Sequence, residues 1–285
     1  MAKRTSASPD RIAFQGELGA FSQMAIRQLL GPKAEAIPCA TFEAMFDALA
    51  AGRVHGAMVP IENTLHGSVH ENYDHLLRFN LPIVGETSVR IVHNLIVPPD
   101  VKASAVRRVY SHPVALNQCL NFFREHPELE KVTYYDTAGS VKMLAEEKPS
   151  DAAAIASVLA AEMYGCRIVK RSIEDDKLNF TRFFLLRKEA APMPAQVPKR
   201  GYKTSLVFTT RNIPGALFRA LSALALRDID MNKIESRPFK GRRWEYLFYV
   251  DFLGHTNEPA VLNALSHLRE VADMLKVLGC YPRGD

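Results

Sequence analysis

The alternation of short apolar runs with amphipathic helical segments is the feature that most restricts the fold of this chain. Strand-like and helix-like segments follow one another over residues 11–171. This alternation is typical of α/β proteins built on a parallel sheet. The predicted strands are 11–15, 34–39, 56–60, 106–110, 132–135, 151–155 and 168–171; the predicted helices end near Leu30, Gly52 and Leu77 and continue with 113–123, 139–146 and 157–164.

An extended stretch at 81–98 interrupts the alternation and divides it into two α/β lobes. Its part at 85–97 is a natural crossing between the lobes, and the apolar run that follows Asn179 is predicted to cross back. The predicted fold is therefore α/β with a two-lobed, periplasmic-binding-protein-like domain, whose ligand lies in the cleft. Solute-binding proteins share this architecture, so the fold alone does not decide the function.

A second domain is predicted beyond residues 190–200, which hold three prolines and read as a semi-rigid linker. Its predicted elements follow the order βαββαβ, which is that of a ferredoxin-like sandwich. We therefore divide the chain into a two-lobed domain at 11–189, the linker at 190–200 and a second domain at 201–285. The predicted strands of the second domain are 203–210, 231–238, 244–252 and 275–281, with a helix after 212–215 and another at 259–271.

Composition limits the class of protein. Of the 285 residues, 47% are hydrophobic and 24% are charged, which is ordinary for a globular protein. No apolar stretch approaches the roughly 18 residues of a membrane span, and no signal-peptide pattern precedes the first strand. The four cysteines form no C-x-x-C pair, so neither a disulfide framework nor a zinc site is expected. We expect no metal and a cytoplasmic protein with reduced thiols.

The charge balance does not indicate a macromolecular partner. The formal net charge is +5, and the Lys and Arg residues are spread along the chain. Nucleic-acid-binding proteins concentrate basic residues, often with interleaved aromatics. We expect neither a nucleic acid nor a membrane as partner. The small excess of positive charge would suit a small anionic ligand, although solubility alone explains it.

The segment 173–187 joins a polar stretch to the pattern of a buried strand. It reads I-E-D-D-K-L-N-F-T-R-F-F-L-L-R, with Thr181 near the polar end of the apolar run. Because alternate side chains of a strand share a face, Thr181 is expected to point with Asn179 and Phe183, and away from Arg182. A hydroxyl and an amide at this point could form a reactive corner. On spacing alone, an ordinary strand with one threonine is the better interpretation.

Four loops between predicted strands and helices share glycine and hydroxyl-bearing residues. Each could offer free backbone N–H groups and a helix N-terminus to an anion. Each could also be an ordinary helix cap, which is the better interpretation for any one of them. All four at the carboxyl ends of strands in one cleft would favour an anionic ligand. The loops are 16–22, 62–68, 111–113 and 137–140.

Five segments resemble, in order along residues 11–187, the signature segments of the prephenate dehydratase family. The last of them contains the T-R-F signature at Thr181. In the fourth, Gly139 departs from the family's pattern, which leaves the role of that loop less defined. The segments are F-Q-G-E-L-G-A-F-S, I-E-N-T-L-H-G-S, Y-S-H-P-V-A-L-N-Q-C, D-T-A-G-S-V and N-F-T-R-F.

The resemblance implies an enzyme, a carbon–oxygen lyase that needs no cofactor. The family removes water and carbon dioxide from prephenate and gives phenylpyruvate, a step of phenylalanine and thus aromatic amino acid biosynthesis. Aromatisation of the ring drives the reaction. The enzyme must donate a hydrogen bond or proton to a poor leaving hydroxyl, and it must hold a dianion in position.

Position by position, the resemblance implies Thr181 as donor to the leaving hydroxyl and Glu62 as the second catalytic residue. Glu62 could supply or orient a proton if burial raised its pKa, but a carboxylate that merely holds a loop is nearly as good an interpretation. Capping is the alternative for the polar residues of the loops, and strand alternation turns Arg182 away from Thr181. The implied substrate-binding residues are Asn63, Ser111, Gln118, Thr137, Asn179 and Arg182.

The second domain resembles an ACT regulatory domain over its full length. Its segments P-G-A-L-F at 214–218 and I-E-S-R-P at 234–238 match the ACT motifs. In this family these segments bind phenylalanine between paired ACT domains, which implies feedback inhibition and a homodimer or homotetramer. A glycine lets a ligand approach the backbone, and a helix N-terminus can meet a carboxylate, whereas core packing is the alternative for the apolar members. The implied allosteric residues are Gly215, Ala216, Leu217, Phe218, Glu235, Ser236, Arg237 and Pro238.

Two other functions remain open at this point. Arogenate dehydratase performs the same reaction on the aminated substrate, and the wall of the pocket would have to discriminate between them. A two-lobed amino-acid sensor without catalysis has the same architecture, but it would have no need of Thr181.

Overall fold

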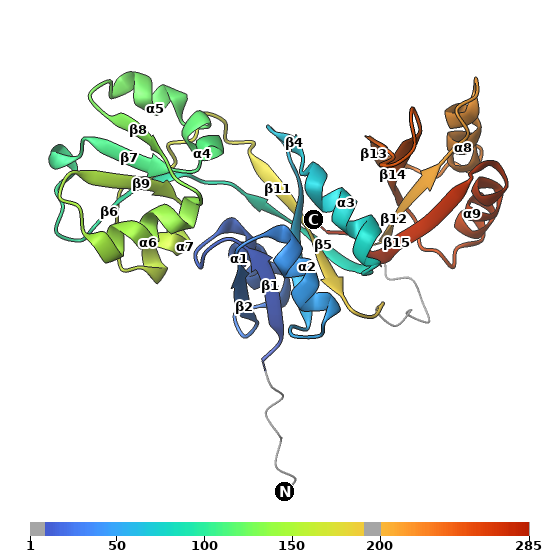
Figure 1. Cartoon of the computed structure of the whole chain (residues 1–285), viewed down its shortest axis with the longest axis horizontal. Coiled ribbons are helices and arrows are strands. Elements are labelled where there is room, and N and C mark those ends of the chain that lie inside the picture. The colour runs from blue at the N-terminus through green and yellow to red at the C-terminus, as the bar shows by residue number, and fades with distance from the viewer. Residues whose placement is uncertain (1–8, 191–200, 285) are drawn as a thin grey trace, which may run out of the picture. The chain divides into compact units, whose positions relative to one another are not determined.

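The structure, a computed structural model, describes residues 9–190 and 201–284 (Figure 1). Its contacts divide the chain into two compact units, Met1–Leu77 with Thr87–Phe184 and Arg78–Glu86 with Leu185–Asp285. Strands β5 (Ile83–Arg90) and β11 (Phe180–Arg187) each contribute residues to both units. The domain limits predicted from the sequence stay predictions, and the predicted linker falls on residues of which 191–200 lie outside the described part.

The first lobe of the first unit is built on parallel strands, as predicted. Strand β1 lies between β2 and β3 and is parallel to both, and β11 lies on the other side of β3. The elements of this lobe are β1 (Arg11–Gln15), α1 (Phe21–Leu30), β2 (Glu35–Cys39), α2 (Phe42–Ala50), β3 (Gly56–Asn63), β4 (Gly67–Ser68) and α3 (His70–Phe79).

Helix α2 shows how local sequence sets this lobe. Thr41 caps it, because the side-chain oxygen accepts a hydrogen bond from the N–H of Ala44. One face carries Met45, Phe46 and Leu49, all fully buried. Burying a side chain of this size contributes about 1.5–3 kcal/mol, so the apolar stripe holds the helix on the sheet.

The prediction of a loop at 62–68 is partly wrong, because both ends of this segment belong to strands. Strand β3 continues to Asn63, and β4 pairs with it in antiparallel register, Glu62 opposite Ser68 and Asn63 opposite Gly67. Gly67 has φ +75°, which suits the tight return. The hairpin brings residues 63–68 together at the end of a strand, where a ligand site in an α/β fold is expected.

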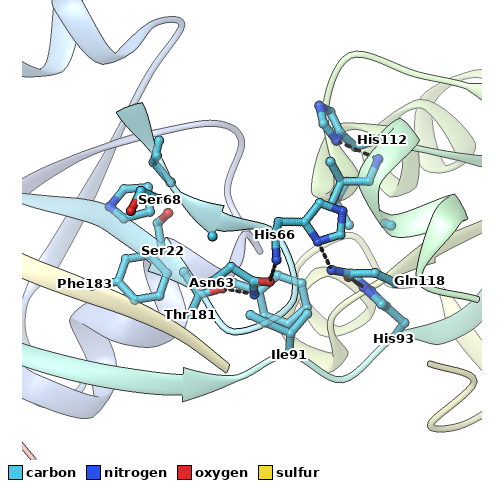
Figure 2. A pocket seen from close by; sticks show the side chains of 17 residues that line it. Ser22, Asn63, His66, Ser68, Ile91, His93, His112, Gln118, Thr181 and Phe183 are labelled. Carbon is cyan, nitrogen blue, oxygen red and sulfur yellow. Dashed lines mark hydrogen bonds between the residues drawn. The ribbon is translucent and has the colours of Figure 1, made fainter. Parts of the chain in front are cut away.

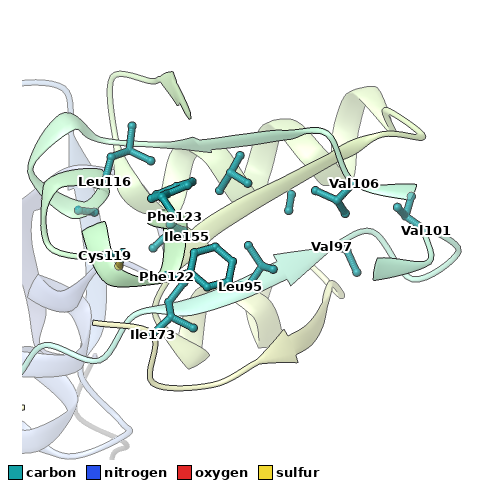
Figure 3. Packing of buried hydrophobic residues seen from close by; sticks show 13 residues of the cluster. Leu95, Val97, Val101, Val106, Leu116, Cys119, Phe122, Phe123, Ile155 and Ile173 are labelled. Atoms are coloured by element: carbon teal, nitrogen blue, oxygen red, sulfur yellow. The ribbon is translucent and has the colours of Figure 1, made fainter. Parts of the chain in front are cut away.

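The second lobe has a five-stranded sheet of order β10-β6-β9-β7-β8 with helices on both faces (Figure 1). Along β9, Ala153 and Ile155 pack with the apolar cluster under α4 and α5, whereas Ala152, Ala154 and Ala156 pack under α6 and α7 (Figure 3). Because both faces of β9 are buried, its sequence is apolar at every position from Ala152 to Ala156. The elements are β6 (Asn94–Val97), a 3₁₀ turn (Ala103–Ala105), β7 (Arg108–Ser111), α4 (Pro113–Asn117), α5 (Leu120–Glu125), β8 (Glu130–Thr133), α6 (Thr137–Glu147), β9 (Ala152–Ala156), α7 (Val158–Met163) and β10 (Arg167–Lys170).

Two features of this lobe differ from the prediction. Strands β6 and β10 are antiparallel to their neighbours, so the sheet is mixed rather than parallel. The helix predicted at 113–123 is two helices. Helix α4 ends at Asn117, with Gln118 as its C-cap, and the carboxylate of Asp175 accepts hydrogen bonds from the N–H groups of Leu120 (2.8 Å) and Asn121 (2.9 Å) at the start of α5. A carboxylate from a distant loop thus caps the second helix.

The second unit contains the predicted βαββαβ sandwich. Its sheet has the order β13-β14-β12-β15, and every pairing among these strands is antiparallel. Buried residues of the sheet and of both helices form one core, in which Phe208 and Phe252 are almost fully buried. The elements are β12 (Tyr202–Thr209), α8 (Ala216–Ala225), β13 (Met231–Pro238), β14 (Tyr246–Leu253), α9 (Pro259–Val271) and β15 (Met274–Pro282).

A buried ion pair lies inside this second unit. Lys203 Nζ lies 2.7 Å from Glu86 Oε1, and the two side chains are 12% and 4% exposed. The N–H of Gly284 also donates to this carboxylate oxygen (3.0 Å).

A glycine allows β15 to approach β5. Gly279 of β15 pairs with Ile83 of β5, and a Cβ on that glycine would lie 2.2 Å from the carbonyl oxygen of Ile83. The glycine is therefore required for this approach.

Candidate active site

A cavity of about 290 Å³ lies in the first unit, where the end of β3 and the start of β11 meet the starts of α4 and α6 (Figure 2). Residues of both lobes line it. Its wall is formed by Phe21, Ser22, Pro60, Asn63, His66, Gly67, Ser68, Val69, Ile91, His93, His112, Val114, Ala115, Gln118, Thr137, Thr181 and Phe183.

The side chain of Asn63 is the centre of hydrogen bonding on the first-lobe side. Its Nδ2 donates to Asn179 Oδ1 (2.7 Å), to the carbonyl oxygen of Phe180 (3.1 Å) and to Thr181 Oγ1 (2.9 Å). Its Oδ1 accepts from the N–H groups of Leu65 and His66, both at 3.0 Å. One amide therefore fixes the start of β11 and the β3–β4 turn together.

Thr181 lies in the wall of the cavity, and its hydroxyl oxygen has a defined partner. Its oxygen accepts the hydrogen bond from Asn63, and a hydroxyl that accepts still has its own O–H to donate. Phe183, two residues along the strand, also lines the cavity, as the alternation of a strand predicts. Thr181 can therefore donate a hydrogen bond to a bound ligand.

Glu62 and Arg182, predicted as catalytic and substrate-binding residues, do not line the cavity. Arg182 Nη1 lies 3.7 Å from Glu62 Oε1, and the guanidinium lies over the ring of Phe184, 4.7 Å from its centre. The alternation of β11 turns Arg182 and Phe184 away from Thr181. The two side chains thus contact each other outside the cavity wall, and the roles predicted for them stay predictions.

Ser111 also lies outside the cavity wall, because it serves the sheet of the second lobe. Its hydroxyl is fully buried and donates to the carbonyl oxygen of Ile155 (2.7 Å), which joins the end of β7 to β9. Asn179 is fully buried, and its oxygen holds Asn63. Neither side chain forms part of the wall, so any effect on a ligand is transmitted through the residues that they hold.

Thr137 lines the cavity, but residues 137–140 are not the loop that was predicted. They form the first turn of α6, whose cap is Asp136: its Oδ1 accepts from the N–H of Gly139 (2.7 Å). Burial raises the pKa of Asp136 above its ordinary value. A Cβ on Gly139 would lie 2.9 Å from the ring of Tyr135, so this departure from the family pattern fits the local packing.

The loop at 16–22 reaches the cavity with Phe21 and Ser22 at the start of α1. It also contacts the second lobe closely. Ser157 Oγ donates to the carbonyl oxygen of Gly19 (2.6 Å), and a Cβ on Gly19 would lie 2.6 Å from the Cα of Ala160. With φ +90° as well, this position strongly disfavours any side chain.

Three histidines of the cavity were not predicted from the sequence. His93 is 1% exposed, and its Nε2 lies 2.8 Å from Gln118 Oε1; Gln118 Nε2 lies 3.1 Å from His66 Nδ1. Burial lowers the pKa of His93. His112 caps α4 by accepting from the N–H of Val114 (3.2 Å), and burial lowers its pKa also. These histidines come from distant segments, so no local spacing indicates their grouping.

None of the described residues that line the cavity is Lys, Arg, Asp or Glu. A negative charge in it would meet neutral donors and the N-terminus of α1 at Phe21–Ser22, which has no side-chain cap, whereas the carboxyl group of Asp136 caps the N-terminus of α6. Helix N-termini favour anions because their first N–H groups are unpaired and their dipoles point outward. The cavity therefore suits an anion that is recognised by hydrogen bonds.

Asn63→Asp is expected to lower kcat/KM by about 10- to 100-fold. The carboxylate cannot donate, so it would place a negative charge against the oxygens of Asn179, Phe180 and Thr181 and release the hydroxyl; leaving buried hydrogen-bonding groups without their partner costs about 1–3 kcal/mol. Steady-state kinetics on the substrate proposed below measures the loss. Asn257→Asp, on an exposed loop of the second unit, is the matched control. Equal rates for the two variants would contradict the role given to Asn63.

The eight residues predicted to bind phenylalanine lie on two elements of the second unit. Gly215, with φ +77°, precedes α8, and Phe218 on the first turn of that helix is 77% exposed. The other group occupies the end of β13, the last strand in the order of its sheet, where Ser236 and Pro238 are exposed. Glu235 and Arg237, which alternate with these two along the strand, are only partly exposed, and Leu217 packs against the core of the unit.

In the part of the chain that the structure describes, no group of three or more His, Cys, Asp or Glu side chains is placed to hold a metal ion. The helices among the same residues are all too short or too polar to cross a membrane.

Comparison with known proteins identifies the family of both parts. The family model for prephenate dehydratase matches residues 12–191, and that for the ACT domain matches residues 204–270. The chain is 44% identical over 281 residues to arogenate dehydratase/prephenate dehydratase 2, chloroplastic, of Arabidopsis thaliana; the match covers 95% of this chain and 72% of that protein.

Two solved structures have the same fold over nearly their whole length. Prephenate dehydratase from Arthrobacter aurescens, in complex with L-Phe, is 31% identical with a TM-score of 0.86, covering 96% of this chain and 90% of the other. A protein described as GqqA, a novel type of quorum quenching acylase, is 37% identical with a TM-score of 0.88, covering 95% and 97%. On the strength of the two family models and of the Arabidopsis relative, this chain belongs to the prephenate dehydratase family of dehydrating lyases and carries a C-terminal ACT domain.

Proposed function

We propose that the chain converts prephenate to phenylpyruvate, carbon dioxide and water. The observation that carries the proposal is the hydroxyl of Thr181, which accepts from Asn63 and so keeps its O–H for a ligand in the cavity. Donated to the ring hydroxyl of prephenate, that hydrogen bond stabilises the negative charge that develops as the C–O bond breaks. The ring carboxylate leaves as carbon dioxide, its bonding electrons complete the aromatic ring, and the departing hydroxide takes up one proton, supplied in the end by solvent, to become water.

The cavity wall supports prephenate rather than arogenate as the substrate. Arogenate carries an ammonium group where prephenate carries a keto group. No Asp or Glu is found among the described wall residues, so the ammonium would enter without a carboxylate partner. A cation taken from water without a partner loses several kcal/mol of solvation free energy. A keto oxygen needs only a hydrogen-bond donor.

The second unit is proposed to bind phenylalanine as a feedback inhibitor. The Arthrobacter prephenate dehydratase of the same fold is in complex with L-Phe, and the ACT model covers α8 and β13, which carry the eight predicted residues. The exposed edge of β13 would suit pairing of two ACT domains in a homodimer or homotetramer. We also propose a cytoplasmic location, with which the four free cysteines are compatible.

An acylase activity, suggested by the GqqA likeness, has less support in the cavity. For Thr181 to serve an acylase as the nucleophile, a base would have to take the proton of its hydroxyl. The contact that the structure gives to Thr181 Oγ1 is the amide nitrogen of Asn63, which donates and cannot accept a proton. The arrangement therefore suits donation by Thr181 and not its activation as a nucleophile.

The test is phenylpyruvate formation by the purified chain from prephenate, with arogenate in parallel and phenylalanine added to each. Turnover of prephenate that phenylalanine suppresses is the expected result. Activity on arogenate alone would move the assignment to arogenate dehydratase. Phenylalanine binding without activity on either substrate would indicate an amino-acid sensor and overturn the role of Thr181.

A further inference from the structure

His93, Gln118 and His66 form a hydrogen-bonded chain within the wall of the cavity (Figure 2). Gln118 is the C-cap of α4 and is 7% exposed, whereas His66 lies in the turn between β3 and β4 and is exposed in the cavity wall. The side chain of Gln118 thus has one histidine on each side.

The donor and acceptor roles along this chain follow from what an amide can do. Gln118 Oε1 only accepts, so His93 must carry its proton on Nε2. Gln118 Nε2 only donates, so Nδ1 of His66 must be the acceptor. A neutral imidazole has one proton, and that of His66 therefore resides on Nε2.

Exchanging the positions of the oxygen and nitrogen of the Gln118 amide would cost free energy at His93. Its Nδ1 is buried and has no hydrogen-bond partner among the described residues. In the arrangement above this atom is a lone pair. With the amide reversed, it would be a buried N–H without an acceptor, and orphaned N–H groups are rarer in proteins than orphaned acceptors. Burial of His93 thus determines which nitrogen of His66 is protonated.

We propose that His66 donates its Nε2–H to the substrate carboxylate that is retained in the product, and is thereby a binding residue of the site. The inference rests on the proposed function. His66 Nε2 has no hydrogen-bond partner shown in the described structure, and no Lys or Arg is found among the described residues of the wall to meet a carboxylate. The ring carboxylate is the other candidate for this contact. A fixed donor there would stabilise the negative charge that the carboxylate gives up when it leaves as carbon dioxide, and this would slow the reaction.

A contact with a retained group is equally strong before and during the reaction. Its loss therefore raises KM and leaves kcat unchanged. His66→Asn keeps an oxygen near the position of Nδ1, where it can accept from Gln118, but has nothing at the position of Nε2. His66→Gln does the reverse, because its amide nitrogen can reach the position of Nε2.

The expected result is a KM for prephenate that is about 10- to 100-fold higher in His66→Asn, the loss typical of a hydrogen bond to a charged group, and changed far less in His66→Gln. Inhibition by phenylpyruvate, which keeps the same carboxylate, should weaken in parallel. His126→Asn, on the surface of the second lobe beside Glu128, serves as the control and should not change either value.

The ¹⁵N shifts of the His66 ring in the ligand-free protein test the proton position independently of activity. They should show a protonated Nε2 and an unprotonated Nδ1, and the opposite tautomer would overturn the inference. So would an unchanged KM in His66→Asn, or a fall in kcat, in an otherwise active chain. Inactivity of the unaltered chain on both substrates would instead overturn the proposed function, and the inference with it.

Discussion

Thr181→Val should lower kcat for prephenate by about 10²- to 10⁴-fold, the range that proton or hydrogen-bond donation to a reacting group contributes in enzymes. Valine has the shape of threonine and lacks only the hydroxyl, so the wall of the cavity keeps its form. Because the lost hydrogen bond strengthens as the hydroxyl leaves, the effect should fall on kcat and little on KM.

The variant should still fold. Asn63 Nδ2, which loses Thr181 as an acceptor, keeps Asn179 Oδ1 and the carbonyl oxygen of Phe180. Thermal denaturation checks this point beside the kinetics. Thr181→Ser, which restores a hydroxyl on a smaller side chain, should recover most of the rate. A valine variant that retained the full rate would exclude Thr181 as the donor to the leaving group.

Glu86→Ala should destabilise the second unit by about 3–5 kcal/mol, the cost of leaving one member of a buried ion pair without its partner. Lys203 would stay largely buried, and the N–H of Gly284 would lose its acceptor as well. Calorimetric or denaturant unfolding of the full chain measures the loss.

Two comparisons make this result specific. Glu35→Ala removes the partner of Arg11 from a pair at 3.8 Å whose side chains are about half exposed, and such a surface pair contributes about 1 kcal/mol or less. Glu86→Leu combined with Lys203→Met should recover much of the stability, because apolar side chains can replace a buried pair. Equal losses for Glu35→Ala and Glu86→Ala would show that burial does not matter here.

The elements of the fold were largely predictable because their signals are local. The bounds of β13 and α9 agree with the prediction at 231–238 and 259–271. The directions of β6 and β10, and the break between α4 and α5, were not predictable in this way. Strand direction follows from pairing partners, and the cap of α5 is Asp175, far away in the sequence.

The candidate site shows the same division. The motif segments pointed to Asn63, Gln118, Thr137 and Thr181, and all four residues line the same cavity. They come together because each segment lies where a strand ends or a helix begins. The same motifs also contain residues that serve the scaffold, such as Ser111 at the joint of β7 and β9, and a motif does not separate the two classes. His66 and His112 lie inside two of these segments but were not singled out from them, whereas His93 lies outside all five and only the folded chain brings it to the cavity.

Because the described residues of the cavity wall include no Lys, Arg, Asp or Glu, they affect how a ligand first approaches the cavity. Attraction between full charges acts over about 10 Å at ordinary ionic strength, whereas hydrogen bonds and helix ends act over little more than contact distance. The wall itself therefore contributes little long-range attraction to the encounter with an anion. Selection among anions of similar charge then occurs after entry, through the directions of individual donors such as those of Asn63 and Thr181.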